Sequence, residues 1–412
     1  MLKLKCAVQN YAWGKPGRES EVAKLYSSGN DNAEVDDEKP YAELWMGTHP
    51  SGPSHISSGP SKDSTLKSWI AENESSLGKT LLEKYGKDLP FLFKVLSVQT
   101  ALSIQAHPHK SLAEELHADR PHVYKDDNHK PEMTLALTDF EALSCFVSYQ
   151  ELHDSITQVP ELAECIGKDK VDAISAALSD ANAETNQQGA LKEAFKSVMK
   201  QDSQVVKQLI EKLIARLSKQ EDTLTAKEKL ILRLNTQYPG DVGIFAAYFL
   251  NYITLTPGQA IYLEANEPHA YLSGNCVEVM ATSDNVVRAG LTPKLRDTDV
   301  LCSMLTYKTG MPEILDGKQV TEHMKAYTPP FDEFQINVLD LSSGQSAKVD
   351  QVNGPLLVLV YEGSGTINEE FQISKGDVFF IPDGQVLDVK ANQTTKDKGC
   401  VLYIASANAR IF

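Results

Sequence analysis

Three strand-like segments carry polar side chains that could share one metal ion. In SIQAHPH, the alternation of a β-strand places Gln105 and His107 on one face, and in HKPEMTLAL it places Lys130 beside Glu132. A third segment, EPHAYL, contributes His269. Two imidazoles, one carboxylate and one amide oxygen suit Zn²⁺, with Fe²⁺, Co²⁺ and Mn²⁺ as competitors on ligand type. We therefore expect a metal centre that keeps a net positive charge and acts as a Lewis acid.

Each of these side chains has a less specific explanation when it is taken alone. A single buried histidine such as His269 is more often a hydrogen-bonded core residue, and an isolated Glu132 would be a surface carboxylate. The combination favours a shared ion. Burying four polar groups without such an ion would cost on the order of several kcal/mol. Three further histidines follow the end of a strand or lie in a polar segment, and we expect solvated loop roles for them: His109, His117 and His122.

The second half of the chain contains two copies of one strand, turn and strand spacing. From Gly376 the pattern is G-x5-P-x-G-x2-L, which ends at Leu387. From Gly258 it is G-x5-E-x-N-x2-H, which ends at His269. Both resemble the second conserved motif of the cupin superfamily, G-x5-P-x-G-x2-H, whose final histidine points into a small β-barrel. We therefore expect a metal-binding barrel around His269 and a metal-free barrel around Leu387.

The elements that would position these residues change in character along the chain. The first part mixes short β-like runs with turn-rich loops. A helical region follows, with an apolar stripe from Val205 to Leu217. After Thr254 the sequence again has the pattern of β-strands. We expect a mainly β fold with an α-helical domain, in which two cupin (jelly-roll) β-barrels occur and the catalytic one is interrupted by a helical insertion. The predicted domains are 1–149 plus 254–315 for the catalytic barrel, 150–253 for the helical domain and 316–412 for the C-terminal barrel.

Composition limits the classes of partner. A net charge of −16 over 412 residues argues against nucleic acid and anionic membranes as partners, because most of the surface would repel phosphate. A small anionic substrate fits if a few Lys and Arg gather in one cleft. The longest apolar run, VGIFAAYFL, is half a membrane span, and no signal peptide is recognised, so we expect a cytoplasmic monomer. The 6 cysteines form no CxxC pair, which indicates reduced thiols.

Longer motif blocks along the whole chain resemble the type I phosphomannose isomerases. The blocks are QNYAWG, YAELWMGTHPSGPS, LSIQAHPHK, DDNHKPEM and EPHAYLSGNCVEVMATSDNVVRAGLTPKLRD. The resemblance implies a reversible, zinc-dependent conversion of mannose 6-phosphate into fructose 6-phosphate through an enediol, which feeds GDP-mannose synthesis and mannose metabolism. It also implies one Zn²⁺ per chain, held by the set that strand alternation gives, namely Gln105, His107, Glu132 and His269.

Residues around the metal receive roles from the same resemblance. Arg288 matches the family's active-site arginine, and Lys294 and Ser103 occupy positions associated with the substrate phosphate. Strand alternation adds two further candidates. Tyr271 shares the strand face of His269 and would line the pocket, and Glu278 would steady a metal ligand or Arg288.

Proton transfer belongs to a separate group of residues. Lys130, His129 and Asp284 match family residues proposed for ring opening and proton transfer. Lys130 and Asp284 are alternatives for the base, and Asp284 could instead orient Lys130. Arg288 is permanently charged and planar, so it suits holding an enediolate or a phosphate and does not suit removing a proton.

Two other classes of protein could use the same barrel. An iron-dependent cupin dioxygenase also has His and carboxylate ligands, but it has no need for Lys130, Arg288 and Lys294 around the metal. A non-catalytic sugar-binding cupin would bind a sugar phosphate without turnover. We expect the helical domain to cover one side of the cleft.

Overall fold

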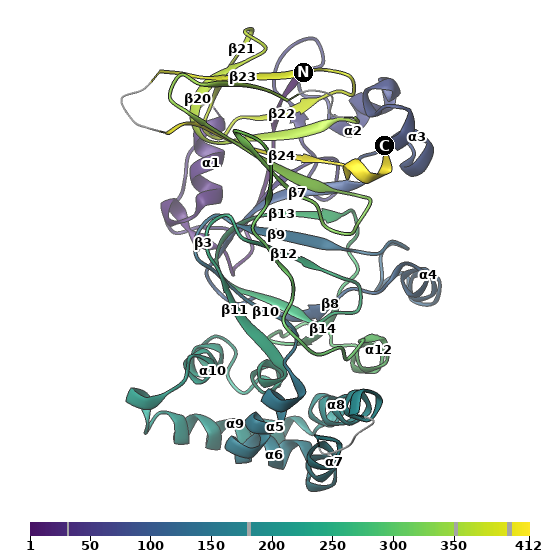
Figure 1. Cartoon of the computed structure of the whole chain (residues 1–412), viewed down its shortest axis with the longest axis vertical. Coiled ribbons are helices and arrows are strands. Elements are labelled where there is room, and N and C mark those ends of the chain that lie inside the picture. The colour runs from purple at the N-terminus through teal and green to yellow at the C-terminus, as the bar shows by residue number, and fades with distance from the viewer. Residues whose placement is uncertain (31–32, 179–182, 350–352, 394–397) are drawn as a thin grey trace.

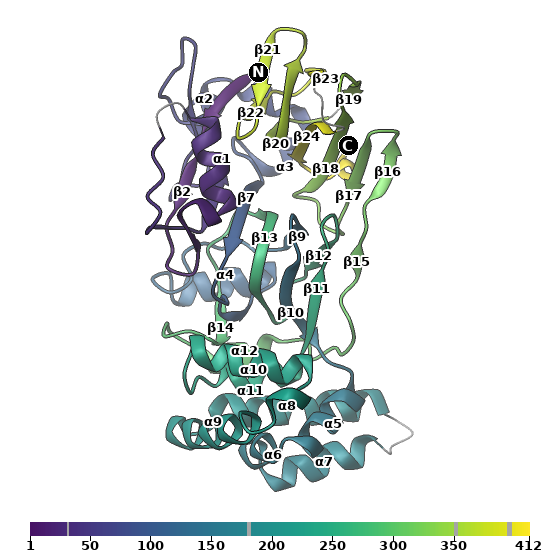
Figure 2. The same ribbon diagram turned by 90° about the vertical axis from the view of Figure 1, so that its left-hand side faces the viewer.

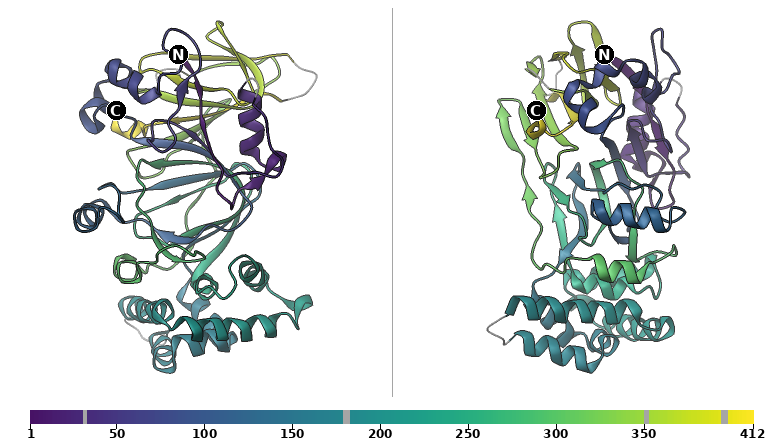
Figure 3. Two further views of the ribbon diagram at one scale, coloured as in Figure 1. Left: turned by 180° about the vertical axis from the view of Figure 1, so that it is seen from behind. Right: turned by 90° about the vertical axis from the view of Figure 1, so that its right-hand side faces the viewer.

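The computed structural model arranges the chain as three layers stacked along its longest axis (Figure 1). A β-barrel formed by the C-terminal part of the chain lies at one end, a second β-barrel lies in the middle, and a group of helices lies at the other end. Views turned about the long axis show the same order (Figures 2 and 3). The structure describes residues 1–30, 33–178, 183–349, 353–393 and 398–412. The predicted fold, with two barrels and a helical domain, is confirmed.

The middle barrel is built around one long strand, β13 (His269–Ala281). Its C-terminal half pairs with β7 (Phe91–Val98) and β9 (Glu132–Ala136), and its N-terminal half pairs with β8 (Ile104–Ala106) and β10 (Phe140–Phe146). The remaining strands of this barrel are β2 (Ala7–Gln9), β5 (Glu43–Met46), β11 (Leu250–Leu255), β12 (Ala260–Leu263), β14 (Val287–Gly290) and β15 (Ile314–Leu315).

Gly274 lies where β13 changes its partners. Its φ is 112°, and a Cβ at this position would lie 2.4 Å from the carbonyl oxygen of Asp139. Glycine alone satisfies both the conformation and the close approach. On one side of this point His269 is opposite Gln105, and on the other side Glu278 is opposite Lys94. A single strand therefore supplies two different parts of the site.

The C-terminal barrel is organised around β20 (Leu356–Ile367). Its neighbours are β21 (Phe371–Ser374), β22 (Val378–Ile381), β23 (Leu387–Ala391) and β24 (Lys398–Ser406). The N-terminal strand belongs to this sheet too, with Leu2 opposite Phe380. The other strands here are β1 (Leu2–Lys5), β6 (His55–Ile56), β16 (Lys318–Thr321), β17 (Met324–Tyr327), β18 (Gln335–Ser342) and β19 (Ser346–Val349).

The repeated spacing predicted from the sequence corresponds to the same turn in both barrels. Gly258 and Gly376 both have a φ of 89°, β12 and β22 follow them, and His269 and Leu387 each begin the next strand. Leu387 is fully buried in the apolar core of its barrel. A further apolar cluster joins the two barrels, because it includes Phe93 from one and Phe380 from the other.

The helical layer covers the end of the middle barrel that lies far from the C-terminal barrel (Figure 1). In α9 (Ser203–Leu217), the predicted apolar stripe is buried except for Ile214, which is partly buried, and Val205, which is 39% exposed. The other helices of this layer are α5 (Tyr149–Gln158), α6 (Pro160–Ile166), α7 (Lys168–Leu178), α8 (Ala183–Lys200), α10 (Ala226–Gln237) and α11 (Gly243–Ala246).

Shorter elements fill the remaining connections. They are α1 (Glu21–Gly29), α2 (Leu66–Glu72), α3 (Lys79–Tyr85), α4 (Lys110–Asp119), α12 (Thr298–Met304), β3 (Lys15–Pro16) and β4 (Pro40–Tyr41). Within the described ranges, no helix has the length and apolar character to cross a membrane. The cysteines are all free thiols, as the sequence indicated.

Candidate active site

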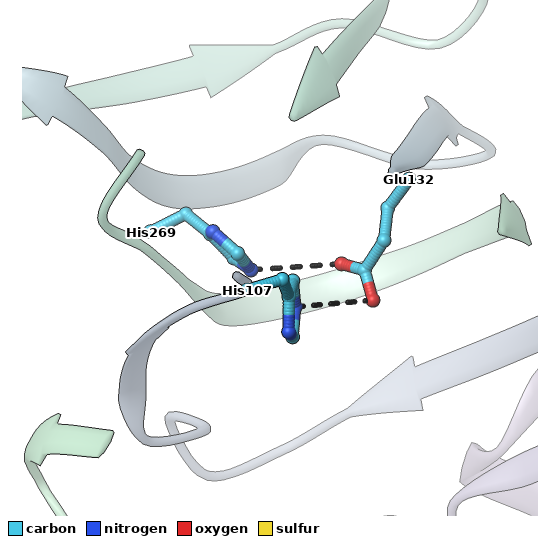
Figure 4. Close-up of side chains that lie close together, drawn as sticks. All are labelled: His107, Glu132 and His269. Atoms are coloured by element: carbon cyan, nitrogen blue, oxygen red, sulfur yellow. Dashed lines mark ion pairs between the residues drawn. The ribbon is translucent and has the colours of Figure 1, made fainter. Parts of the chain in front are cut away.

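Three buried side chains converge inside the middle barrel (Figure 4). His107 follows β8, Glu132 begins β9 and His269 begins β13. The Nε2 atom of His107 lies 3.4 Å from one carboxylate oxygen of Glu132, and the Nε2 atom of His269 lies 3.5 Å from the other. None of the three side chains is more than 3% exposed. The structure thus brings together three of the four side chains that the sequence proposed as metal ligands.

Hydrogen bonds from the far side of each ring fix how the two imidazoles present themselves. His107 Nδ1 lies 2.7 Å from the carbonyl oxygen of Asn285, and His269 Nδ1 lies 3.1 Å from that of Glu267. A carbonyl oxygen only accepts, so Nδ1 of each ring carries a proton, and in the neutral form of either ring Nε2 has the lone pair. Both Nε2 atoms lack a hydrogen-bond partner and face the carboxylate of Glu132. Acceptors that face acceptors in a buried site fit a metal ion between them.

The protonation states agree with that arrangement. Burial lowers the pKa of His107 to about 4, so this imidazole is neutral at pH 7, the form that binds metals. Burial opposes the ionisation of Glu132, but the charge of Lys130 together with the interactions with His107 and His269 outweighs it and holds the pKa of this carboxyl well below its usual range. The Nζ atom of Lys130 lies 3.1 Å from the Glu132 carboxylate. The cluster therefore combines one ionised carboxylate with a neutral ring.

Gln105 is the neutral member of the predicted ligand set. It lies directly opposite His269 in the ladder between β8 and β13, and opposite Arg288 in the ladder between β8 and β14. Its Oε1 atom accepts a hydrogen bond of 3.2 Å from the Ser103 hydroxyl. Two imidazole nitrogens, a carboxylate and an amide oxygen fit the donor set of a zinc ion, so the side chains present suit this metal.

A cavity of about 460 Å³ opens beside Gln105. Burial lowers the pKa of Arg288 in its wall, and among the residues that the structure describes no carboxylate offsets that effect. The positive charge of Arg288 is therefore free to bind an anion. The cavity has polar lining from Ser103, Gln105, Arg288 and Lys294, and from Gln237 and Tyr238 of the helical layer.

A buried ion cluster behind the metal ligands was not predicted from the sequence. Lys94 Nζ lies 3.1 Å from Glu278 and 3.4 Å from Glu43, and it lies 5.1 Å from the centre of the Trp45 ring. Burial, partly offset by Lys94, raises the pKa of Glu278. The structure therefore pairs Glu278 with Lys94. The available signal was a single lysine in the apolar run FLFKVLSV, since a strand buried on both faces rarely holds an unpaired charge.

His49 is a second residue that sequence reasoning missed. Its Nε2 atom lies 3.3 Å from Asp284, and its ring packs edge-on against Trp45 with a centroid distance of 4.9 Å. The hydrogen bond with His49 lowers the pKa of Asp284, and the charge of Lys130 acts in the same direction. Lys130 and Asp284 are therefore within electrostatic reach of each other. Nothing in the spacing of the motif blocks connected His49 with Asp284.

The structure also shows the surroundings of two further predicted residues, His129 and Tyr271. His129 Nε2 lies 2.6 Å from Glu333, beyond the last strands of the middle barrel, so its part in ring opening stays a prediction. Tyr271 is 4% exposed, and its ring centroid lies 6.3 Å from that of His269.

The three histidines for which we expected loop roles lie outside the cluster of buried side chains. His109 caps α4 by accepting a hydrogen bond from the Leu112 amide. His117 lies inside α4, with its Nδ1 atom 2.7 Å from the carbonyl oxygen of Tyr124, so the expected loop position for this residue was wrong. His122 is exposed.

The barrel topology and the buried cluster define the chain as a cupin with a group of side chains that could hold a metal ion beside a basic cavity. Family models described as phosphomannose isomerase type I, catalytic domain and helical insertion domain, match residues 1–149 and 165–250. Mannose-6-phosphate isomerase 1 of Arabidopsis thaliana is 48% identical over 412 residues, which cover 99% of this chain and 94% of that protein. Mannose-6-phosphate isomerase of Homo sapiens is 42% identical, with 95% of each covered. This chain belongs to the type I phosphomannose isomerases, which are aldose–ketose isomerases.

Solved structures agree with the sequence comparisons. A variant of phosphomannose isomerase from Salmonella typhimurium has a TM-score of 0.82 and 28% identity, and the match covers 99% of each chain. A mannose 6-phosphate isomerase bound with zinc and yttrium has the same TM-score, identity and coverage. The resemblance identified in the sequence is confirmed.

Proposed function

We propose that this chain interconverts D-mannose 6-phosphate and D-fructose 6-phosphate and uses one Zn²⁺ ion. The observation that carries the proposal is the buried set of lone pairs on His107, Glu132 and His269, which lies beside a cavity lined by Arg288 and Lys294. A basic cavity in a chain of net charge −16 fits a small anionic substrate. The names of the relatives support mannose 6-phosphate as that substrate, and the zinc-bound relative supports the metal.

Four side chains would hold the zinc ion: Gln105, His107, Glu132 and His269. When bound, the ion supplies positive charge that stabilises the negative charge developing on a sugar oxygen. The carbonyl groups of Asn285 and Glu267 orient the two imidazoles for this purpose, because they fix the proton of each ring on Nδ1.

Different residues of the one cavity would bind the phosphate and the reacting atoms. Ser103 and Lys294 both line the cavity, and we assign the substrate phosphate to them. Arg288 lies opposite Gln105 in the sheet and so lies near the metal ligands. Its planar, permanently charged guanidinium would hold the oxygens of the enediolate. Tyr271 and Glu278 support the site from within the barrel.

Proton transfer requires a group that takes a proton from C2 and returns one to C1. We assign this step to Lys130 and Asp284 acting together, because the charge of Lys130 helps to keep Asp284 ionised. Lys130 also bonds with Glu132, so it lies against the metal cluster. His129 precedes Lys130 in the chain and bonds with Glu333. From this position it would assist ring opening.

The remaining parts of the proposal concern the organisation of the chain. The catalytic barrel comprises 1–149 plus 254–315, the helical domain 150–253, and the metal-free barrel 316–412. The protein acts as a cytoplasmic monomer, and its product in the direction of mannose 6-phosphate feeds GDP-mannose synthesis.

A coupled assay for fructose 6-phosphate formed from mannose 6-phosphate tests the proposal. We expect turnover that a chelator abolishes and added zinc restores. A His269→Ala variant should remain inactive after zinc is added, and a His117→Gln variant, altered outside the cavity, should behave like the unmodified protein. Absence of turnover by a protein that retains bound zinc would contradict the proposed function.

A further inference from the structure

One short segment of the helical layer contacts both rims of the substrate cavity. The segment runs from Gln237 at the end of α10 to Gly243 at the start of α11. At the first rim, Gln237 accepts a hydrogen bond of 3.1 Å from the Ala101 amide, and the Tyr238 hydroxyl donates one of 2.5 Å to the Ala101 carbonyl. Ala101 lies two residues before Ser103, so this contact fixes the backbone that carries Ser103.

At the second rim, one carboxylate holds the loop that follows β14. One oxygen of Asp241 accepts 2.7 Å hydrogen bonds from the amides of Gly243 and Leu291, and the other accepts one of 3.2 Å from the Thr292 amide. Charge-assisted hydrogen bonds of this kind are stronger than those between neutral groups. Asp241 therefore ties the beginning of α11 to a loop of the catalytic barrel.

The contact is too close for ordinary side chains. A Cβ on Gly290 would lie 2.5 Å from the Cα of Gly243, and a Cβ on Gly243 would lie 2.5 Å from the Leu291 amide nitrogen. Leu291 itself has a φ of 54°, an unfavourable conformation for a branched residue. The loop keeps this strained conformation where Asp241 binds it, which suggests that the contact determines the path of the loop.

The path of this loop continues to Lys294. The hydroxyl of Thr292 accepts a hydrogen bond of 3.0 Å from the Lys294 amide, and Leu291, Thr292 and Lys294 all line the cavity. Asp241 thus acts on Lys294 through two successive hydrogen bonds.

We infer that Asp241 is a positioning residue for the binding of the substrate phosphate, and that the helical insertion thereby sets the distance between Ser103 and Lys294. The inference rests on the proposed function, in which these two residues bind the phosphate. Asp241 touches no reacting atom, so its loss should weaken the binding of phosphate and leave the chemical step largely intact.

The test compares Asp241→Ala and Asp241→Asn with a matched control, Asp202→Ala. Asp202 lies in the same helical layer and also accepts hydrogen bonds from two backbone amides, those of Gln204 and Val205, but neither of these partners lines the cavity, whereas Leu291 and Thr292, the partners of Asp241, do. For each zinc-loaded variant, kcat, KM, inhibition by inorganic phosphate and the increase in Tm caused by phosphate are measured. The last readout requires no turnover.

We expect Asp241→Ala to raise KM about tenfold and to weaken phosphate inhibition by the same factor, with kcat changed by less than about threefold. Asp241→Asn should show a smaller change in the same direction, because its side-chain oxygen still accepts two amides. The asparagine variant also serves as the test if the alanine variant does not fold. Asp202→Ala should leave KM and phosphate inhibition unchanged even if its Tm falls.

Three results would overturn the inference. The first is an Asp241→Asn variant with unchanged KM and unchanged phosphate inhibition, and the second is a loss confined to kcat. The third is unmodified protein that phosphate neither inhibits nor stabilises. Failure of the proposed function would give a different result from failure of this inference. Unmodified protein without turnover would still show an increase in Tm when phosphate is added. Asp241→Asn would reduce that increase if Asp241 positions the rim of the cavity.

Discussion

The two barrels contain the same turn but have different interiors. In the middle barrel the turn ends at His269, which faces Glu132 and His107, whereas in the C-terminal barrel it ends at Leu387 in an apolar core. The similar backbone shows that the turn itself only places a side chain at the start of a strand. A metal site requires polar partners from other strands, and the middle barrel supplies them from β8 and β9.

The barrels also differ in the charges they bury. The middle barrel encloses Lys94, Glu43 and Glu278 in addition to the proposed metal ligands. In the C-terminal barrel the carboxylate of Asp377 is buried and pairs with Lys3 at 2.7 Å, and an apolar cluster surrounds Leu387. Burying charge is unfavourable unless it is paired, so this difference indicates that the middle barrel retains its charges for function.

Replacing His269 with Leu would give the middle barrel the residue that the C-terminal barrel has. We expect loss of the bound zinc and a fall in turnover of about 10³-fold or more, since a metal ion supplies several kcal/mol of charge stabilisation. Zinc content by elemental analysis and the coupled assay measure the two effects. A variant that keeps both its zinc and its activity would show that His269 is not a ligand.

Replacing Lys94 with Met would leave two buried carboxylates without their partner. We expect a loss of about 3–5 kcal/mol in the free energy of unfolding, measured by denaturant titration. Lys79→Met is the control, because this lysine is exposed and its ion pair with Glu83 contributes little. Equal stability of the two variants would mean that the buried cluster is not held together by Lys94.

Replacing Leu387 with His tests the comparison in the reverse direction. The new imidazole would lie in the apolar cluster that surrounds Leu387, so we expect a destabilisation of about 2–4 kcal/mol and no second zinc ion. Leu387→Met should lose about 1 kcal/mol. If Leu387→His bound a second zinc ion, the turn alone would suffice to make a metal site.

The smallest expected effect concerns the pair of His49 and Asp284. The pKa of Asp284 is lower in the folded protein than in the unfolded chain, so the pair stabilises the fold above the unfolded pKa of about 4 and this stability is lost as the pH falls below it. Asp284 is 43% exposed, so solvent screening limits the contribution to about 0.5 kcal/mol. Unfolding of Asp284→Asn, followed between pH 3 and pH 7, should differ from that of the unmodified protein only in the upper part of the range. A constant difference would contradict this origin.

Local patterns in the sequence predicted much of the site. Alternation within two strands placed Gln105 with His107 and Lys130 with Glu132, because side-chain direction in a strand depends on nearest neighbours alone. The repeated turn identified both barrels for the same reason. The ion pair of Lys94 with Glu278 depends on the register between β7 and β13, which are distant in sequence. No local pattern contains that register.

Contacts between layers could not be predicted from the sequence either. The bond of His129 with Glu333 and the pairing of β1 with β22 both join segments that are far apart in the sequence. They follow from how the two barrels pack. Asp241 belongs to the same group, because its partners Leu291 and Thr292 lie in a different layer.

The most direct test of the central claim is anomalous diffraction at the zinc edge from crystals of the zinc-loaded protein. The account predicts one strong peak per chain, bonded to Gln105, His107, Glu132 and His269, and none inside the C-terminal barrel. A peak at another place, or none at this site in crystals of active protein, would contradict it.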